Sequence, residues 1–241
     1  MTNSPTIDQS VNKATFWSAI VLVLAGVLSV FFPLDAPAGT MAERMMWFSK
    51  NLNSFVIAWA IQMIAMLTLS AVCAGIAWQV RESAPVRVFL AFAALMAATM
   101  AFLIPKFIAL WSIPQMIAES TTVSANAALA EQLFQLLNPT IAYTLFTSLD
   151  YLGFWMYSVM GLLIAAPLFR LGMSAKIAAA GFGLYGVLYH LLLFGVMFSS
   201  VPSADIVIYS GSAAALLLVP VISMAVYFRG RMKSYPAGQP A

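Results

Sequence analysis

Six long apolar runs, separated by short stretches that carry most of the charges, dominate this sequence of 241 residues. A helix rises about 1.5 Å per residue, so a run of roughly 18 residues or more can cross the hydrocarbon core of a bilayer, which is about 30 Å thick. Inside that core the backbone has no water to bond to, so each run is predicted to be a helix. The runs cover residues 16–34, 54–80, 88–105, 140–169, 177–198 and 206–228.

The composition excludes a large soluble core, because 63% of the residues are hydrophobic and only 8% are charged. Ordinary soluble domains are about 25% charged. The sequence therefore predicts an all-α, polytopic protein of the lipid bilayer: one domain over residues 1–233 that is a bundle of six transmembrane helices. The Pro- and Gly-containing tail at 234–241 is expected to be disordered and cytoplasmic.

The basic residues lie at the ends of the runs and are unequally divided between the two sides. Eight lie on one side: Lys13, Arg81, Arg87, Arg170, Lys176, Arg229, Arg231 and Lys233. Three lie on the other: Arg44, Lys50 and Lys106. Basic loops stay in the cytoplasm, so both termini are predicted to be cytoplasmic, in a bacterial-type inner membrane. This placement explains the basic charge without a nucleic-acid partner, which we exclude.

Two details at the edges of the runs affect the predicted topology. The first run precedes Ala36-Pro37-Ala38, a loose match to a signal-peptide cleavage site. It is longer than the usual apolar core of about 7–15 residues, so we expect a retained helix, with cleavage as the alternative. Pro220 lies within the last run and is expected to kink it.

Two connections on the outer side are amphipathic. The segment 41–48 ends in an aromatic pair, and four leucines of the segment 127–137 share one helical face: Leu129, Leu133, Leu136 and Leu137. Such segments are typical of short helices that lie on a membrane surface. We expect two short outer amphipathic helices, which either simply cover the bundle or also close a pocket.

Four polar residues on four different runs are predicted to lie in the outer third of the bundle. Counting about 1.5 Å per residue from the basic end of each run places them roughly 20–30 Å along it. They are Gln62, Lys106, Asp150 and His190. Polar groups inside a membrane are costly and often functional, so their convergence predicts an outward-facing polar pocket for a small ligand or ion.

Asp150 belongs to a stripe of polar and small residues with helical spacing: Tyr143, Thr147, Asp150, Tyr157 and Gly161. Such a stripe is expected to face the bundle interior. Asp150 then binds a cation, relays protons or orients a polar ligand. The alternative is a solvated carboxylate at the outer interface, paired with Lys106.

His190 follows a different pattern, since Ala179, Gly183 and Gly186 precede it on one face. Small residues at this spacing allow helices to approach closely, so His190 is expected at a helix contact. There it either donates as a neutral group to a carbonyl or pairs with Asp150, which would give a group that titrates near neutral pH. Lys106 is alternatively a residue that snorkels to the interface, and Gln62 one that bonds to another helix.

Several chemistries are excluded by the residue count. One histidine and one cysteine, Cys73, do not supply a disulfide, a bis-histidine haem site or a multi-histidine zinc site. No P-loop, dinucleotide or metalloprotease motif occurs. We therefore predict no metal, no cofactor and no catalytic residue.

Four segments carry a resemblance that extends over nearly the whole chain. They are Lys13-Ala14-Thr15, the outer segment 41–50, Leu149-Asp150-Tyr151-Leu152-Gly153-Phe154 and Leu168-Phe169-Arg170-Leu171-Gly172. With them the sequence resembles a family of uncharacterised bacterial six-helix integral membrane proteins, grouped under a domain of unknown function. The resemblance implies six spans and brings no catalytic residue with it.

Three functions are compatible with these features. The first is a non-enzymatic protein that binds or helps to move a small ligand or ion, with Asp150 as anchor, His190 as its pH-sensitive partner, and Gln62, Lys106, Tyr143, Thr147 and Tyr157 around them. The second is an accessory subunit of a larger membrane complex or a homo-oligomer, with small-residue faces as contacts. The third is a membrane enzyme that acts on a lipid, which needs a hydrophilic groove and two cooperating polar groups.

Overall fold

The computed structural model describes residues 6–120, 125–202 and 205–233. The tail predicted at 234–241 lies outside the described residues. Within them the chain is helical throughout, without a strand, and six helical stretches are long and apolar enough to cross a membrane. The prediction of an all-α polytopic membrane protein with six spans is confirmed.

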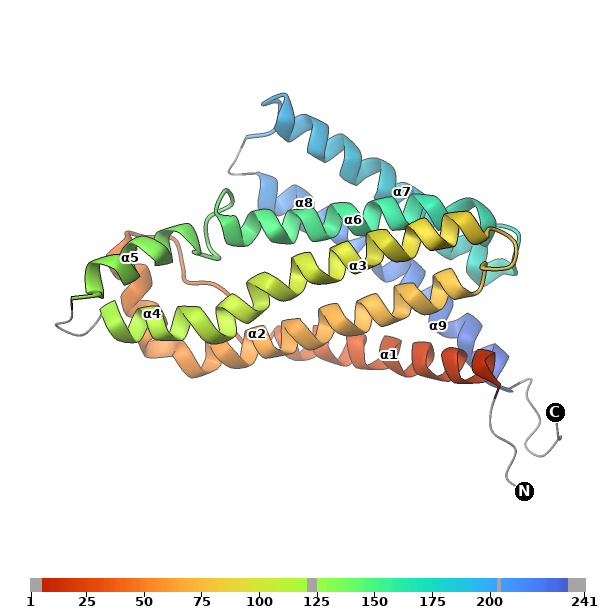
Figure 1. Cartoon of the computed structure of the whole chain (residues 1–241), viewed down its shortest axis with the longest axis horizontal. Coiled ribbons are helices and arrows are strands. Elements are labelled where there is room, and N and C mark those ends of the chain that lie inside the picture. Colours follow the sequence, from red (N-terminus) through yellow and green to blue (C-terminus); the bar gives the residue numbers. More distant parts are fainter. Residues whose placement is uncertain (1–5, 121–124, 203–204, 234–241) are drawn as a thin grey trace, which may run out of the picture.

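The helices lie along one long axis, with the start of α1 and the end of α9 at the same end (Figure 1). We call this the terminal end, and the opposite end, where α4 and α5 lie, the cap end. The elements are α1 (Ile7–Ser29), α2 (Met41–Trp78), α3 (Pro85–Phe107), the π-helical turn η1 (Ile108–Ser112), α4 (Ile113–Ser120), α5 (Ala127–Leu136), α6 (Leu145–Leu168), α7 (Met173–Met197), α8 (Ile206–Ala215) and α9 (Leu218–Lys233).

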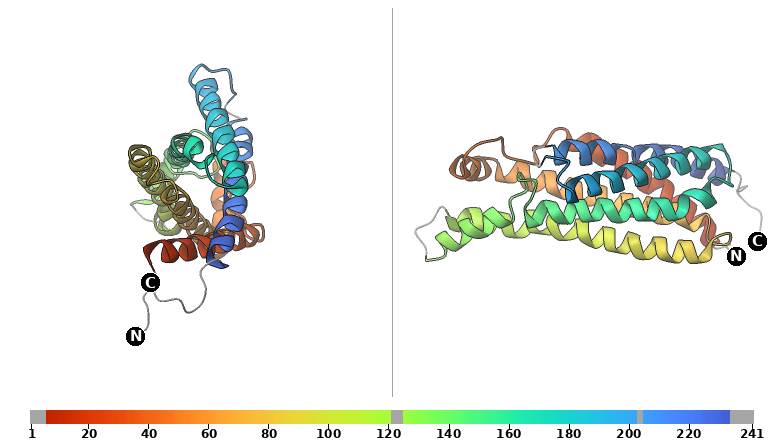
Figure 2. Two further views of the ribbon diagram at one scale, coloured as in Figure 1. Left: turned by 90° about the vertical axis from the view of Figure 1, so that its right-hand side faces the viewer. Right: turned by 90° about the horizontal axis from the view of Figure 1, so that it is seen from above.

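The spans close into a ring in which α1, α2, α3, α6, α7 and α9 each contact the next, and α9 returns to α1 (Figure 2). The bundle core fills this ring and includes Phe102, Tyr157 and Phe182. Small residues allow the closest approaches. A Cβ at Gly153 would lie 2.7 Å from the Phe102 ring, and one at Gly186 would lie 2.5 Å from Leu162.

Two of the helices are longer than the sequence predicts. The segment 41–48 forms a short helix, as predicted, which begins at a Thr40–Glu43 capping box and is joined to the second span through a kink, so that α2 contains both. No proline or glycine interrupts the chain from Met41 to Ala74, so the helix bends at Asn51 (φ −114°, ψ 15°) instead of ending. The third span likewise continues past Pro105 through η1 and α4 to Ser120.

Local hydrogen bonds and proline explain the other differences. The fourth span begins at Leu145 rather than at residue 140, because Thr144 caps the helix and its hydroxyl donates to the Asn138 carbonyl at 2.8 Å. The last span is interrupted at Leu216 and Leu217. Pro220 has no N–H to donate to the Leu216 carbonyl, so the kink expected from this proline is confirmed.

A second hydrophobic core lies at the cap end, where η1, α4, α5 and the first turns of α2 extend beyond the bundle core. Its aromatic centre joins Phe48 with Phe55 and Phe134 in edge-to-face contacts, with ring centroids 4.8 Å and 5.3 Å apart. Of the four leucines predicted on one face, Leu129, Leu133 and Leu136 of α5 are exposed (55%, 41% and 52%), whereas Leu137 follows α5 and packs partly buried against this core. This apolar outer face is the arrangement expected of a helix that lies on a membrane surface.

The contact between α1 and α2 predicts a strong glycine requirement. A Cβ at Gly75 would overlap the Thr15 side chain, whereas a Cβ at Gly26 would meet open space. Overpacking a tight contact costs about 1–3 kcal/mol. We expect Gly75→Ala to lower the thermal unfolding midpoint of the detergent-solubilised protein and Gly26→Ala to leave it unchanged or slightly raised. Equal midpoints for the two variants would contradict this contact.

Candidate functional site

Lys106 and Asp150 form a buried ion pair between α3 and α6. The side chains are 5% and 20% exposed, so neither charge is fully hydrated. The Lys106 ammonium also lies 4.9 Å from the ring centroid of Phe102 and 5.4 Å from that of Trp59. Phe102 belongs to the bundle core and Trp59 to the cap core, so the pair marks the boundary between the two.

The pair decides between the alternatives that the sequence left for these two residues. Asp150 does pair with Lys106, but the pair is buried rather than solvated at the interface. Lys106 does not snorkel to the surface, because only 4% of the residue is exposed. An aromatic ring on each side replaces the water that a snorkelling ammonium would reach.

Threonine and asparagine side chains shape the entry to α6 beside this pair. The Thr147 hydroxyl donates to the Ile141 carbonyl at 2.9 Å, and Arg44 of α2 donates to the Thr140 hydroxyl. The side chain of Asn138 is fully buried, and its amide nitrogen has no hydrogen-bond partner among the described residues. These contacts hold the non-helical segment that precedes α6 at the cap end.

Tyr157 lies in the bundle interior, as the predicted stripe requires. Its hydroxyl lies 2.6 Å from that of Ser70, which accepts a hydrogen bond from Thr99 at 2.8 Å. The network joins α6, α2 and α3 through the hydroxyl groups of a tyrosine, a serine and a threonine. Tyr143 departs from the stripe, because it precedes α6 and is 77% exposed. Gln62 is half-buried on α2 and makes no side-chain bond to Asp150 or His190 in the described structure.

His190 is oriented by three neighbours, none of which is Asp150. Its Nδ1 lies 2.8 Å from the Gly186 carbonyl and 3.3 Å from the Ser158 hydroxyl, and its Nε2 lies 3.1 Å from Trp155 Nε1. A carbonyl only accepts and an indole N–H only donates, so the network assigns the proton to Nδ1 and the acceptor lone pair to Nε2. The prediction that a neutral histidine donates to a carbonyl fits this geometry, and a His190–Asp150 pair does not.

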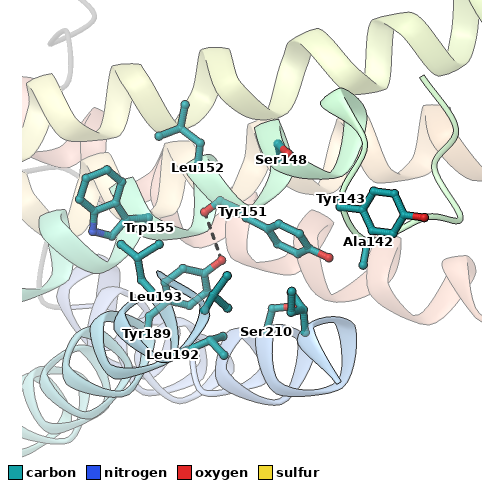
Figure 3. Close-up of a pocket in the computed structure, with 12 residues that line it drawn as sticks. Ala142, Tyr143, Ser148, Tyr151, Leu152, Trp155, Tyr189, Leu192, Leu193 and Ser210 are labelled. Atoms are coloured by element: carbon teal, nitrogen blue, oxygen red, sulfur yellow. Dashed lines mark hydrogen bonds between the residues drawn. The ribbon is translucent and has the colours of Figure 1, made fainter. Parts of the chain in front are cut away.

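A groove lies in the cap-end half of the bundle, between α6, α7 and α8 (Figure 3). It has a volume of about 370 Å³ and is lined mainly by apolar surface. None of the described lining residues is charged. Its aromatic walls come from Tyr143, Tyr151, Trp155 and Tyr189.

The groove exists because α7 diverges from α6 toward the cap end (Figure 1). Nearer the terminal end the two helices are held together by tyrosines of α7, since Tyr185 donates to the Phe154 carbonyl and Tyr189 donates to the Tyr151 carbonyl at 3.1 Å. Past Tyr189 these bonds end and the helices separate.

Of the residues singled out from the sequence, Tyr143 alone is part of the described groove lining, and His190 reaches it through Trp155. Sequence reasoning missed Tyr151, Trp155 and Tyr189 as lining residues. The signal that could have found them is the aromatic-rich stretch 151–157 at the same depth as Tyr189. Among the described residues no group of three His, Cys, Asp or Glu side chains could hold a metal ion.

Comparisons with protein-family models, with curated proteins and with solved structures found no match.

The buried pair predicts an asymmetric response to mutation. Asp150→Asn leaves the Lys106 ammonium without its counter-charge, which typically costs about 3–5 kcal/mol. Replacing both partners with apolar residues, as Lys106→Met with Asp150→Leu, removes the stranded charge and should restore most of the stability. Unfolding in mixed micelles measures each change, and Asp205→Asn at the same end is the matched control. If Asp150→Asn were as stable as the parent protein, the ion pair would not contribute to stability as predicted.

The His190 network makes a second prediction. His190→Leu leaves the indole N–H of the half-buried Trp155 without its acceptor, which should cost at most the roughly 1–3 kcal/mol of a fully buried unsatisfied donor. In a Trp155→Phe background this donor is already absent, so the same replacement should cost less. The unfolding free energies of the parent protein, the two single variants and the double variant give the coupling energy between His190 and Trp155. If the two replacements had additive effects, this would argue against the hydrogen bond.

Proposed function

We propose that this integral membrane protein is non-enzymatic and binds an uncharged amphiphile dissolved in the bilayer, with one acyl or isoprenoid chain seated in the groove between α6, α7 and α8. The observation that carries the proposal is an apolar, aromatic-walled groove in the cap-end half of the bundle. Its volume of about 370 Å³ lies within the range of small-molecule sites. The proposal keeps the sequence-based hypothesis of a small ligand but moves the binding site from Asp150 and His190 to this groove.

The surrounding solvent argues for the class of ligand. The helices around the groove are spans, so its open side faces hydrocarbon rather than water. An apolar surface there is complementary to a hydrocarbon chain. The hydroxyls of Ser148 and Tyr151 offer hydrogen bonds to an uncharged polar end, while the absence of charge from the described lining disfavours an ion.

The ion pair argues against Asp150 as the ligand anchor. Its carboxylate already pairs with Lys106, whose ammonium is enclosed by Phe102 and Trp59. A cation that bound Asp150 would have to displace a charge that has little other access to water. We assign this pair to holding α3 and α6 together.

The His190 network argues against an enzyme. Ser158 is the hydroxyl nearest to His190, but its own bond goes to the Trp155 carbonyl at 2.7 Å and it is fully buried. His190 Nε2 is occupied by Trp155, and Nδ1 bears the proton. The pair therefore has no free base to activate the serine. The alternative of a membrane enzyme that acts on a lipid requires a hydrophilic groove, and the groove between α6, α7 and α8 is mainly apolar.

We place the protein in a bacterial inner membrane with the terminal end in the cytoplasm and the groove toward the outer leaflet. Eight basic residues at the terminal side against three on the other support this orientation. The even number of spans and the shared end of α1 and α9 are consistent with it. Membership of the family of uncharacterised six-helix proteins is part of the same proposal.

Photo-cross-linking tests the groove directly. The full-length protein is reconstituted in phosphatidylcholine nanodiscs with a diacylglycerol that carries a diazirine in one acyl chain, and adducts are mapped by mass spectrometry. We expect adducts on the cap-end halves of α6 and α7. Leu193→Trp fills the groove and should lower these adducts several-fold, whereas Leu191→Trp, on the exposed face of α7, should not.

Equal adduct levels in the two tryptophan variants would contradict the proposal, because they would indicate lipid that merely surrounds the protein. Native mass spectrometry of the same protein, extracted gently from its own membrane, tests the alternative. A protein partner in fixed stoichiometry would favour an accessory subunit over a lipid-binding protein.

A further inference from the structure

We propose that the terminal end of the bundle carries a second site, which binds the phosphate of an anionic phospholipid between the start of α3 and the end of α6. The carrying observation is a cavity of about 380 Å³ into which Arg87 of α3 and Arg170, two residues beyond α6, both contribute. The site is independent of the apolar groove, which lies in the other half of the bundle and has no described charged lining residue.

The two arginines lack the carboxylate partner that Arg81 and Lys106 have. Arg81, in the same connection between α2 and α3, pairs with Asp8 at 3.0 Å and with Glu82 at 3.1 Å. Neither Arg87 nor Arg170 forms an ion pair in the described residues, and no acidic residue occupies the first turn of α3. Arg87 and Arg170 therefore bring two positive charges to one cavity, and an anion bound there would be attracted by both.

The depth and shape of the cavity favour a lipid headgroup as that anion. Its lining residues lie where two spans begin and end, which is the level of the headgroups. Pro85, Ala166 and Pro167 add an apolar wall beside the arginines. A guanidinium binds phosphate through paired N–H donors, and basic cavities between spans at the cytoplasmic surface suit anionic headgroups.

Lipid-resolved native mass spectrometry tests the site. The full-length protein is reconstituted in nanodiscs of phosphatidylcholine with one-tenth phosphatidylglycerol, and the lipids that stay bound after release are counted. We expect bound phosphatidylglycerol to be enriched over phosphatidylcholine. The double variant Arg87→Gln with Arg170→Gln should lower this enrichment roughly tenfold. Lys13→Gln removes one charge from the same end without touching the cavity and is the matched control.

A variant without a charge change keeps the test independent of folding defects and of bulk charge. Ala166→Leu should reduce the enrichment by filling the cavity, while Arg87→Lys with Arg170→Lys should retain much of it. Enrichment that survives Ala166→Leu and the Gln double variant, or that falls equally with Lys13→Gln, would overturn the proposal. Release of the bound lipid by millimolar inorganic phosphate, with phosphate then retained in its place, would also overturn it in favour of a soluble phosphate ligand.

Discussion

The buried ion pair between Lys106 and Asp150 is the interaction on which the arrangement of this membrane protein depends. Each charge alone would be costly at that depth, so the helices that carry them, α3 and α6, must stay in contact there. The pair also separates two apolar cores. Phe102 closes it from the bundle side and Trp59 closes it from the cap side. Any function assigned to the polar residues near the cap end therefore has to take into account that Lys106 and Asp150 already satisfy each other.

The ion pair holds α3 and α6 together near the cap end, whereas α7 separates from α6 there (Figure 1). Its glycine at 186 and its tyrosines hold it against α6 up to Tyr189, and beyond that point it diverges. The groove is the space that the divergence leaves. His190 lies next to the groove and accepts a hydrogen bond from Trp155, which lines it. The histidine for which the sequence allowed a pair with Asp150 thus bonds instead to a residue of the groove lining.

The two proposed sites differ in the physics of their surroundings. The groove between α6, α7 and α8 has no charged residue in its described lining and is formed by predicted spans, so an apolar chain is the ligand proposed for it. The cavity at Arg87 and Arg170 lies where two spans begin and end and is lined by two basic residues, so a phosphate is the ligand proposed for it. Their positions at opposite ends of the same helix, α6, make that helix the element common to both.

The sequence by itself determined the solvent, the number of spans and the bend at Pro220, because hydrophobic length and the geometry of proline are local properties. It also determined that Lys106 and Asp150 were candidates for each other, since both were placed at one depth. Only the tertiary structure decided that the pair is buried, that His190 bonds to Trp155, and that α2 and the third span continue far beyond their apolar runs. Those outcomes depend on which side chains from distant parts of the sequence surround a polar group, as Trp59 of α2 lies against Lys106 of α3. The hydrophobic pattern of the sequence does not show which distant side chains meet.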